Sequence, residues 1–221
     1  MDSRFPNWLR KTLDKLDFLG IPNLAPLLCA MAVLAFLAQT MGSAPVERFI
    51  FDPVLVLEGE WWRLFTFPIS SGLSNPLLLL FYVLYIYFVI TSLEQQWGPG
   101  PTTIFLMLGY FSALTGSFIT MRPVEIWYYI LENVSLAFGT LFPNYELYIY
   151  FILPVKAKWL AAIAGAFIAF RFVTGGPSTK ILLACSLFPY MLFFGPLLYK
   201  NIREHYKLKQ HKRRFSKDMW R

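Results

Sequence analysis

The chain has 221 residues with a formal net charge of +7 at pH 7; 57% of the residues are hydrophobic and only 15% are charged. A chain of this length that is so apolar and so poor in charge is not expected to be a soluble domain. Its charges are also segregated, because residues 24–44 and 75–93 carry none while the last twenty residues carry many. This segregation is typical of an integral membrane protein.

The N-terminal segment, residues 1–23, precedes the first long apolar run. Between residues 1 and 19 apolar side chains recur at helical spacing, with charged residues on the opposite side. This pattern predicts an amphipathic helix that lies on the cytosolic leaflet of the membrane. The apolar positions are Phe5, Trp8, Leu9, Leu13 and Leu16.

Residues 24–199 contain six runs that are apolar and long enough to cross a bilayer. The hydrocarbon core is about 30 Å thick, and at 1.5 Å per residue a helix needs ~20 apolar residues to cross it. Prolines lie at or just outside most ends of these runs, where a missing N–H costs least. We therefore predict an all-α membrane domain built as a bundle of six transmembrane helices. The predicted spans are 24–42, 76–93, 102–121, 124–142, 157–174 and 181–199.

The first run shares one feature with a secretory signal peptide. Gly42-Ser43-Ala44 follows it and supplies small residues of the kind that precede a cleavage site. The run is longer than a usual signal-peptide core, and the segment before it mixes acidic with basic residues. We interpret the run as a retained first span.

The orientation of the bundle follows from lysine and arginine, which favour cytosolic loops. With six spans, the N-terminus, the loop that holds Lys156 and Lys158, and the C-terminal tail all lie on one side of the membrane. Most basic residues of the chain fall on that side. We therefore expect a multi-pass protein with both its N-terminus and its C-terminus in the cytosol.

Residues 200–221 form a basic tail with aromatic residues among the charges. Nucleic acid binding is conceivable on charge alone. Anionic lipid headgroups explain a basic stretch beside the membrane more economically, since each basic residue near the surface contributes about 1 kcal/mol. We expect membrane lipids to be the partner of this tail and expect no nucleic acid partner.

One long loop, about residues 43–75, is predicted on the side opposite to the tail. A loop of this length is usually functional or well packed. Trp61 and Trp62 are expected at the membrane interface, where tryptophan rings accumulate. Arg63 is expected to bond either the lipid headgroups or nearby carbonyl groups.

The sequence contains no recognisable site for a metal or a cofactor. Cys29 and Cys185 each lie within a predicted span, where free cysteine packs as a small apolar residue. The aspartates lie outside the spans, and His205 and His211 both lie in the tail. Neither an aspartyl protease nor a zinc protease is expected from this distribution.

Several segments resemble the rhomboid family, over roughly residues 45–200. They are EGEWWRLFT at 58–66, LEQQWG at 93–98, FGTLFP at 138–143 and ILPVKAKWL at 152–160. The resemblance implies the six-helix rhomboid fold. It also implies structural roles for Trp61, Trp62, Arg63, Glu94, Gly139 and Gly195.

The resemblance further implies an intramembrane serine protease, with a serine on the fourth helix and a histidine on the sixth. A serine hydroxyl needs a neighbouring base before it becomes a useful nucleophile. In this chain Val134 occupies the position of the serine and Phe188 that of the histidine, while Tyr190 and Met191 replace two glycines of the sixth-helix motif, of which only Gly195 is kept. We therefore assign no catalytic residue.

These departures favour a rhomboid-like pseudoprotease that binds transmembrane segments of single-span client proteins. Two alternatives remain open. One is an active rhomboid-family intramembrane serine endopeptidase with an unrecognised catalytic pair, such as Lys180 with Ser186 or Ser135. The other is a derlin-like factor that assists membrane-protein quality control.

The candidate client-binding residues are Glu132, Asn133 and Ser135, on the fourth predicted span. An ionisable side chain at this depth costs about 3 kcal/mol on insertion scales, so it normally faces the bundle interior and is used there. Two interpretations of Glu132 remain open. It forms part of a polar site that receives a client helix, or it is protonated and hydrogen-bonded within the bundle.

Overall fold

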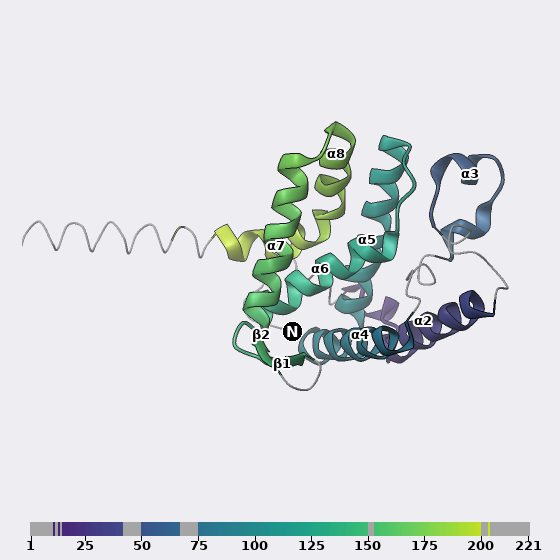
Figure 1. Cartoon of the computed structure of the whole chain (residues 1–221). Helices are drawn as coiled ribbons and strands as arrows, with labels where there is room; N and C mark the ends of the chain where they lie inside the picture. Colours follow the sequence, from purple (N-terminus) through teal and green to yellow (C-terminus); the bar gives the residue numbers. More distant parts are fainter. Residues whose placement is uncertain are drawn as a thin grey trace, which may run out of the picture.

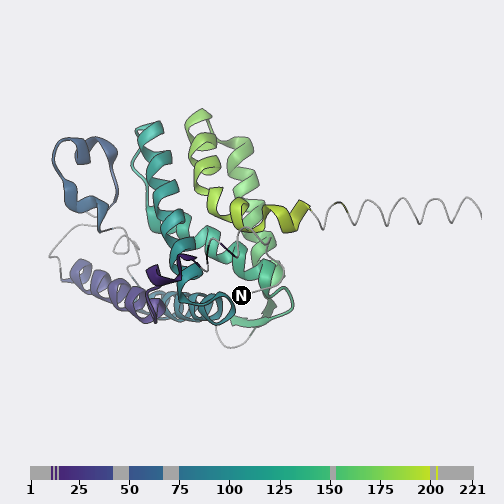
Figure 2. The same ribbon diagram turned by 180° about the vertical axis from the view of Figure 1, so that it is seen from behind.

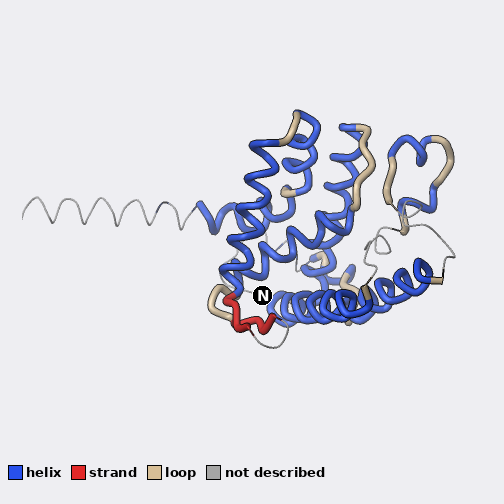
Figure 3. The backbone as a smooth tube through the Cα atoms, viewed as in Figure 1, coloured by secondary structure: helices blue, strands red, loops and turns tan. Residues whose placement is uncertain are grey.

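The computed structural model describes residues 11, 13, 15–41, 50–66, 75–149, 153–199 and 203. Its described part is mostly helical, which confirms the helical prediction, and it adds one short β-hairpin that the sequence did not predict. In Figure 3 helices make up most of the described part of the chain. In chain order the elements are η1 (Asp17–Leu19), α2 (Leu24–Thr40), α3 (Pro53–Leu57), η3 (Trp61–Leu64), α4 (Pro76–Trp97), α5 (Pro99–Thr120), α6 (Ile126–Leu141), β1 (Glu146–Ile149), β2 (Leu153–Lys156), α7 (Ala157–Thr174), α8 (Pro177–Ser186) and an unlabelled helix, Phe188–Tyr199.

Four helices of the described chain are long and apolar enough to cross a membrane. They are Asp17–Thr40, which includes η1 and α2, and the helices α4, α5 and α7. A fifth span results if α8 and helix Phe188–Tyr199, which are bent by 66° relative to each other, count together as one. This is the pattern of a multi-pass membrane protein, but the six predicted spans are not confirmed.

The fourth predicted span is the one that the structure does not confirm, because α6 has only 16 residues. At 1.5 Å per residue α6 is about 24 Å long, less than the ~30 Å of a hydrocarbon core. The predicted run 124–142 is longer than α6 at both ends. Its first residues, however, form no part of the helix, since Val124 makes a β-bridge with Phe51.

The helices run in two main directions. In Figure 1, α2 and α4 lie side by side along the lower part of the molecule, whereas α5, α7 and α8 rise from it. Figure 2 shows the same division from behind. The helix α5 packs against α8, and α6 packs against both α5 and α7. Thus α6 lies among the other helices of the bundle.

Local sequence signals explain where several helices begin. Asn75 precedes α4, and its side-chain oxygen accepts a hydrogen bond of 2.8 Å from the backbone N–H of Leu77, while Pro76 takes the first helical position. Gly98 separates α4 from α5 with a φ of 92°. That backbone region favours glycine, so the chain turns there between two 22-residue helices.

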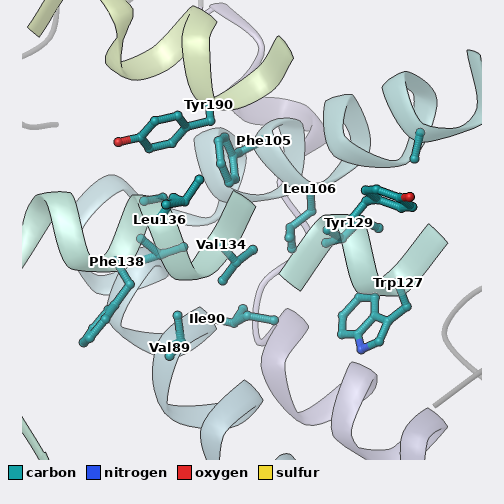
Figure 4. Packing of buried hydrophobic residues seen from close by; sticks show 14 of the residues in the cluster. Val89, Ile90, Phe105, Leu106, Trp127, Tyr129, Val134, Leu136, Phe138 and Tyr190 are labelled. Atoms are coloured by element: carbon teal, nitrogen blue, oxygen red, sulfur yellow. The ribbon is translucent and has the colours of Figure 1, made fainter. Parts of the chain in front are cut away.

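The core is formed by apolar side chains of several helices together with the loop before α4. Val89 and Ile90 of α4 are fully buried, and Figure 4 shows them with Val134 and Leu136 of α6. Phe51, on the loop, is only 1% exposed and packs edge-on against Phe118 of α5. The loop is therefore well packed at Phe51.

The connection between α6 and α7 is the β-hairpin. Its strands β1 and β2 pair antiparallel, with Glu146 opposite Lys156. The N–H of Ala157, the first residue of α7, donates to the carbonyl of Tyr145 over 2.8 Å. The hairpin thus joins α6 to the start of α7 in the region where a basic cytosolic loop was predicted.

The N-terminal segment contacts the bundle where the structure describes it. Leu13 is 2% exposed, and η1 packs against the start of α5. The N–H of Ile21 donates to the Thr103 hydroxyl over 3.1 Å. Most of the predicted amphipathic helix, and the basic tail apart from Arg203, lie outside the described residues.

Candidate functional site

Helix α6 carries the three polar residues that the sequence singled out, and each reaches a different helix. Glu132 bonds Arg171 of α7, Asn133 bonds the backbone of α8, and Ser135 bonds Tyr85 of α4. Neighbouring positions of an α-helix point about 100° apart, which explains why consecutive residues meet different neighbours. The structure brings these side chains to one helix but not to one point.

Glu132 and Arg171 form an ion pair between α6 and α7. The Arg171 Nη1 donates to Glu132 Oε1 over 2.9 Å, and the two side chains are only 22% and 10% exposed, respectively. The guanidinium also donates to the hydroxyls of Tyr129, over 3.0 Å, and Tyr128, over 3.2 Å. The guanidinium carbon also lies within cation–π distance of both tyrosine rings, 5.2 Å from the centre of the Tyr128 ring and 5.4 Å from that of Tyr129.

This cluster places Glu132 inside the protein, as predicted, with a cation as its partner. Two charges removed from water are stable only when good geometry and additional hydrogen bonds compensate for their lost hydration. The tyrosine hydroxyls supply such bonds to Arg171. The ion pair therefore holds α7 against α6 near the end of α7, which is Thr174.

Two oxygens of α6 remain unsatisfied. Among the described residues, neither Glu132 Oε2 nor Asn133 Oδ1 has a hydrogen-bond partner, and both atoms are buried. Glu132 is 9% exposed and Asn133 only 2%. A buried polar atom without a partner carries a desolvation penalty of about 1–3 kcal/mol, so each of these acceptors is a candidate binding feature.

The amide group of Asn133 connects α6 to a break in the last apolar segment. Its Nδ2 donates to the carbonyl of Ser186 over 2.9 Å and to that of Tyr129, in its own helix, over 2.8 Å. Ser186 is the last residue of α8, and Pro189 follows the break at Leu187. Proline has no N–H and cannot continue the bonding of the preceding turn, so the chain bends and Asn133 binds a carbonyl at the bend.

Ser135 is bonded, but not to a base. Within the described chain, its hydroxyl pairs with the Tyr85 hydroxyl over 2.6 Å and with the carbonyl of Leu131 over 2.6 Å. Val134, at the position where the resemblance to rhomboids would place the serine, is 1% exposed within the apolar core. The histidines His205 and His211 lie outside the described residues.

The alternative catalytic pair of lysine and serine does not meet in the structure. Lys180 is exposed near the start of α8, with its Nζ 6.0 Å from the centre of the Phe172 ring. The Ser186 hydroxyl donates to the carbonyl of Leu183, in its own helix, over 3.0 Å. Neither Ser186 nor Ser135 has Lys180 as a hydrogen-bond partner in the described part of the chain.

The motif residues of the long loop differ in their surroundings. Trp61 and Trp62 are 66% and 53% exposed. Arg63 is 6% exposed; it pairs with Glu60 and donates to the carbonyl of Ile50 over 2.7 Å. Of the two partners predicted for Arg63, the structure thus shows a nearby carbonyl.

Glu94, Gly139 and Gly195 were the other motif residues. Glu94 accepts a bond of 3.0 Å from the N–H of Leu24, so it caps the start of α2. At Gly139 an added Cβ would clash with Ala161 and lie 2.9 Å from the carbonyl oxygen of Ala157, so α6 and α7 approach closely there. At Gly195 an added Cβ would meet nothing within 4 Å, and packing does not explain that glycine.

The partners of the α6 residues, above all Arg171, are not predicted by the residues singled out in the sequence. The available signal was that Glu132 is the only charged residue between 126 and 145, and Arg171 the only one between 159 and 179. Two neighbouring apolar runs with one opposite charge each predict a pair. Tyr85, Tyr128 and Tyr129 gave no comparable signal, because aromatic residues are frequent throughout the chain.

Comparisons with known proteins identify no relative of this chain: no family model, no curated protein and no solved structure matches it. Within the described residues there is also no group of three or more histidine, cysteine or acidic side chains that could hold a metal ion. The case for a function therefore rests on the geometry of α6 and on the sequence.

Proposed function

We propose that this chain is a rhomboid-like membrane protein without protease activity, which binds the transmembrane segments of single-span client proteins. In this proposal α6 serves as the fourth of six spans, and α8 with helix Phe188–Tyr199 serves as a bent sixth span. Both termini then lie in the cytosol. The basic tail contacts anionic lipid headgroups on that side.

The surroundings of Ser135 support the absence of proteolysis. Acyl transfer needs a base that takes the proton of the serine hydroxyl. The described partners of Ser135 are a tyrosine hydroxyl and a carbonyl oxygen, neither of which is a general base at neutral pH. Both histidines of the sequence belong to the tail.

The observation that carries the binding proposal is the unsatisfied oxygen of Glu132, whose other oxygen is paired with Arg171. Polar and charged groups at membrane depth are costly, and proteins generally keep them for a use. A helix of another protein that offers a hydrogen-bond donor would bind more tightly at this oxygen than at a purely apolar helix face. The derlin-like alternative uses the same feature, since it also requires contact with client segments.

The test reconstitutes the full chain in vesicles with a fluorescently labelled single-span protein that active rhomboid proteases cleave. We expect energy transfer between the two proteins and no cleavage product. Products that disappear with Ser135→Ala would overturn the proposal in favour of an active protease. Energy transfer no greater than with an unrelated multi-span protein would overturn the binding role.

A further inference from the structure

The polar cluster of α6 and α7 is defined here as Glu132, Arg171, Tyr128 and Tyr129. The cluster can accept one more hydrogen bond, because Oε2 of Glu132 has no partner among the described residues. A carboxylate oxygen accepts hydrogen bonds but does not donate them. The unsatisfied atom of the next residue in the sequence, Asn133 Oδ1, is an acceptor as well. A complementary partner must therefore bring an N–H or O–H group.

The charge of that partner follows from Arg171. Its guanidinium already pairs with Glu132 at 2.9 Å, so the cluster carries one positive and one negative charge and is neutral as a whole. An incoming lysine would add an uncompensated cation in an apolar medium, which is costly. A neutral donor such as a serine, threonine or asparagine side chain adds a bond without adding charge.

The position of the cluster determines which molecule can supply the donor. Tyr128 is 38% exposed and the Arg171 side chain 22%, so the cluster reaches the outer edge of the bundle where α6 meets α7. Among the four candidate spans, α7 is the least buried, and its outward face is apolar. A partner that reaches this edge comes through the lipid and is itself a membrane-spanning helix.

We propose that the cluster recognises a client transmembrane helix by one neutral hydrogen-bond donor, which reaches the buried Oε2 of Glu132 when Tyr128, the more exposed side chain at this edge, moves aside, while Arg171 keeps Oε1. This inference rests on the proposed function and specifies the chemistry of its client. Glu132 lies six residues beyond Ile126, the start of α6, or about 9 Å along the helix. The client donor belongs at the same depth from the non-cytosolic end of its span.

The test uses a leucine- and alanine-rich single-span peptide with one serine at that depth. A matched peptide carries O-methylserine, which keeps the ether oxygen as an acceptor but has no donor, and a third carries lysine. Each peptide carries one fluorescent dye and the full-length protein carries the second dye of an energy-transfer pair. Association is then titrated by fluorescence energy transfer in phosphatidylcholine vesicles. This comparison needs no variant of the protein, so it does not depend on the folding of a mutant.

We expect the serine peptide to bind about 3- to 10-fold more tightly than the O-methylserine peptide, the range that one hydrogen bond between membrane helices provides. Glu132→Gln places an amide donor where Oε2 was, so it should abolish this preference. The exposed Glu125→Gln, at the start of the same helix, is the matched control and should retain it.

Equal binding of the serine and O-methylserine peptides would overturn this inference and leave client binding itself intact. Tighter binding of the lysine peptide than of the serine peptide would overturn the assignment of a neutral donor. If none of the peptides binds above the level of an unrelated multi-span protein, the proposed function fails together with the inference. The separate peptides thus distinguish the two failures.

Discussion

Replacing Arg171 by methionine removes the cation of the buried ion pair but keeps a side chain of similar length. Glu132 would remain in the α6–α7 interface, with 10% of its side chain exposed and no counter-charge. Breaking a buried pair by removing one partner costs about 3–5 kcal/mol, and the partial exposure of Arg171 reduces this to about 2–3 kcal/mol. At about 2–4 °C per kcal/mol for a chain of this size, Tm should fall by about 4–12 °C.

The double variant Glu132→Leu with Arg171→Met separates the ion pair from simple packing. Replacing both charges with apolar groups leaves no unpaired ion, so its stability should lie within about 1 kcal/mol of the wild type. Thermal unfolding in detergent, followed by circular dichroism, measures all four proteins of the cycle. Arg122→Met, which changes an exposed arginine, is the control and should not shift Tm. Strictly additive effects of the two single changes would refute the pairing.

Three further predictions concern helix contacts and the tail. Gly139→Ala should lower the free energy of unfolding by about 1–3 kcal/mol in the same assay because its Cβ clashes with Ala161, whereas Gly195→Ala, with open space around it, should cost nothing. Glu94→Ala removes the cap of α2 and should cost about 1 kcal/mol, while Glu94→Gln keeps an acceptor oxygen and should cost less; equal losses would argue against the cap. A peptide of residues 201–221 should bind vesicles more tightly as anionic lipid increases and less tightly as salt increases, and equal binding to neutral vesicles would contradict the lipid assignment.

The sequence predicted helices and their approximate limits well, because long runs with few or no charged residues are the direct signature of helices in a membrane. It did not predict how those helices lie. Counting apolar residues predicts six spans but takes no account of bends within them. Pro189 lies inside the run 181–199, and the chain bends beside it. Prolines mark the ends of most predicted spans, but a proline can also break a helix in its interior.

The α6 site shows a similar division between what the sequence predicts and what it does not. The burial of Glu132 followed from the cost of an ion at that depth, and the structure agrees. Its pairing with Arg171, 39 residues away, depends on how α6 and α7 align across the hairpin. No local pattern encodes that alignment, because it is set by contacts such as the close approach of Gly139 to Ala161.

Two of the polar side chains that the sequence singled out have the same physical task. Glu94 accepts from the first N–H of α2, and Asn133 donates to a carbonyl at the end of α8. In lipid no water can satisfy the backbone groups that a helix leaves free at its ends, so side chains of neighbouring helices must do so. The Nδ2 group of Asn133 donates to this carbonyl, which fixes the orientation of the amide group. In that orientation its oxygen has no partner among the described residues. The need to satisfy a carbonyl at the bend thus accounts for one of the two buried acceptors without a described partner, and the other, Glu132 Oε2, is the atom that the client donor is proposed to bond.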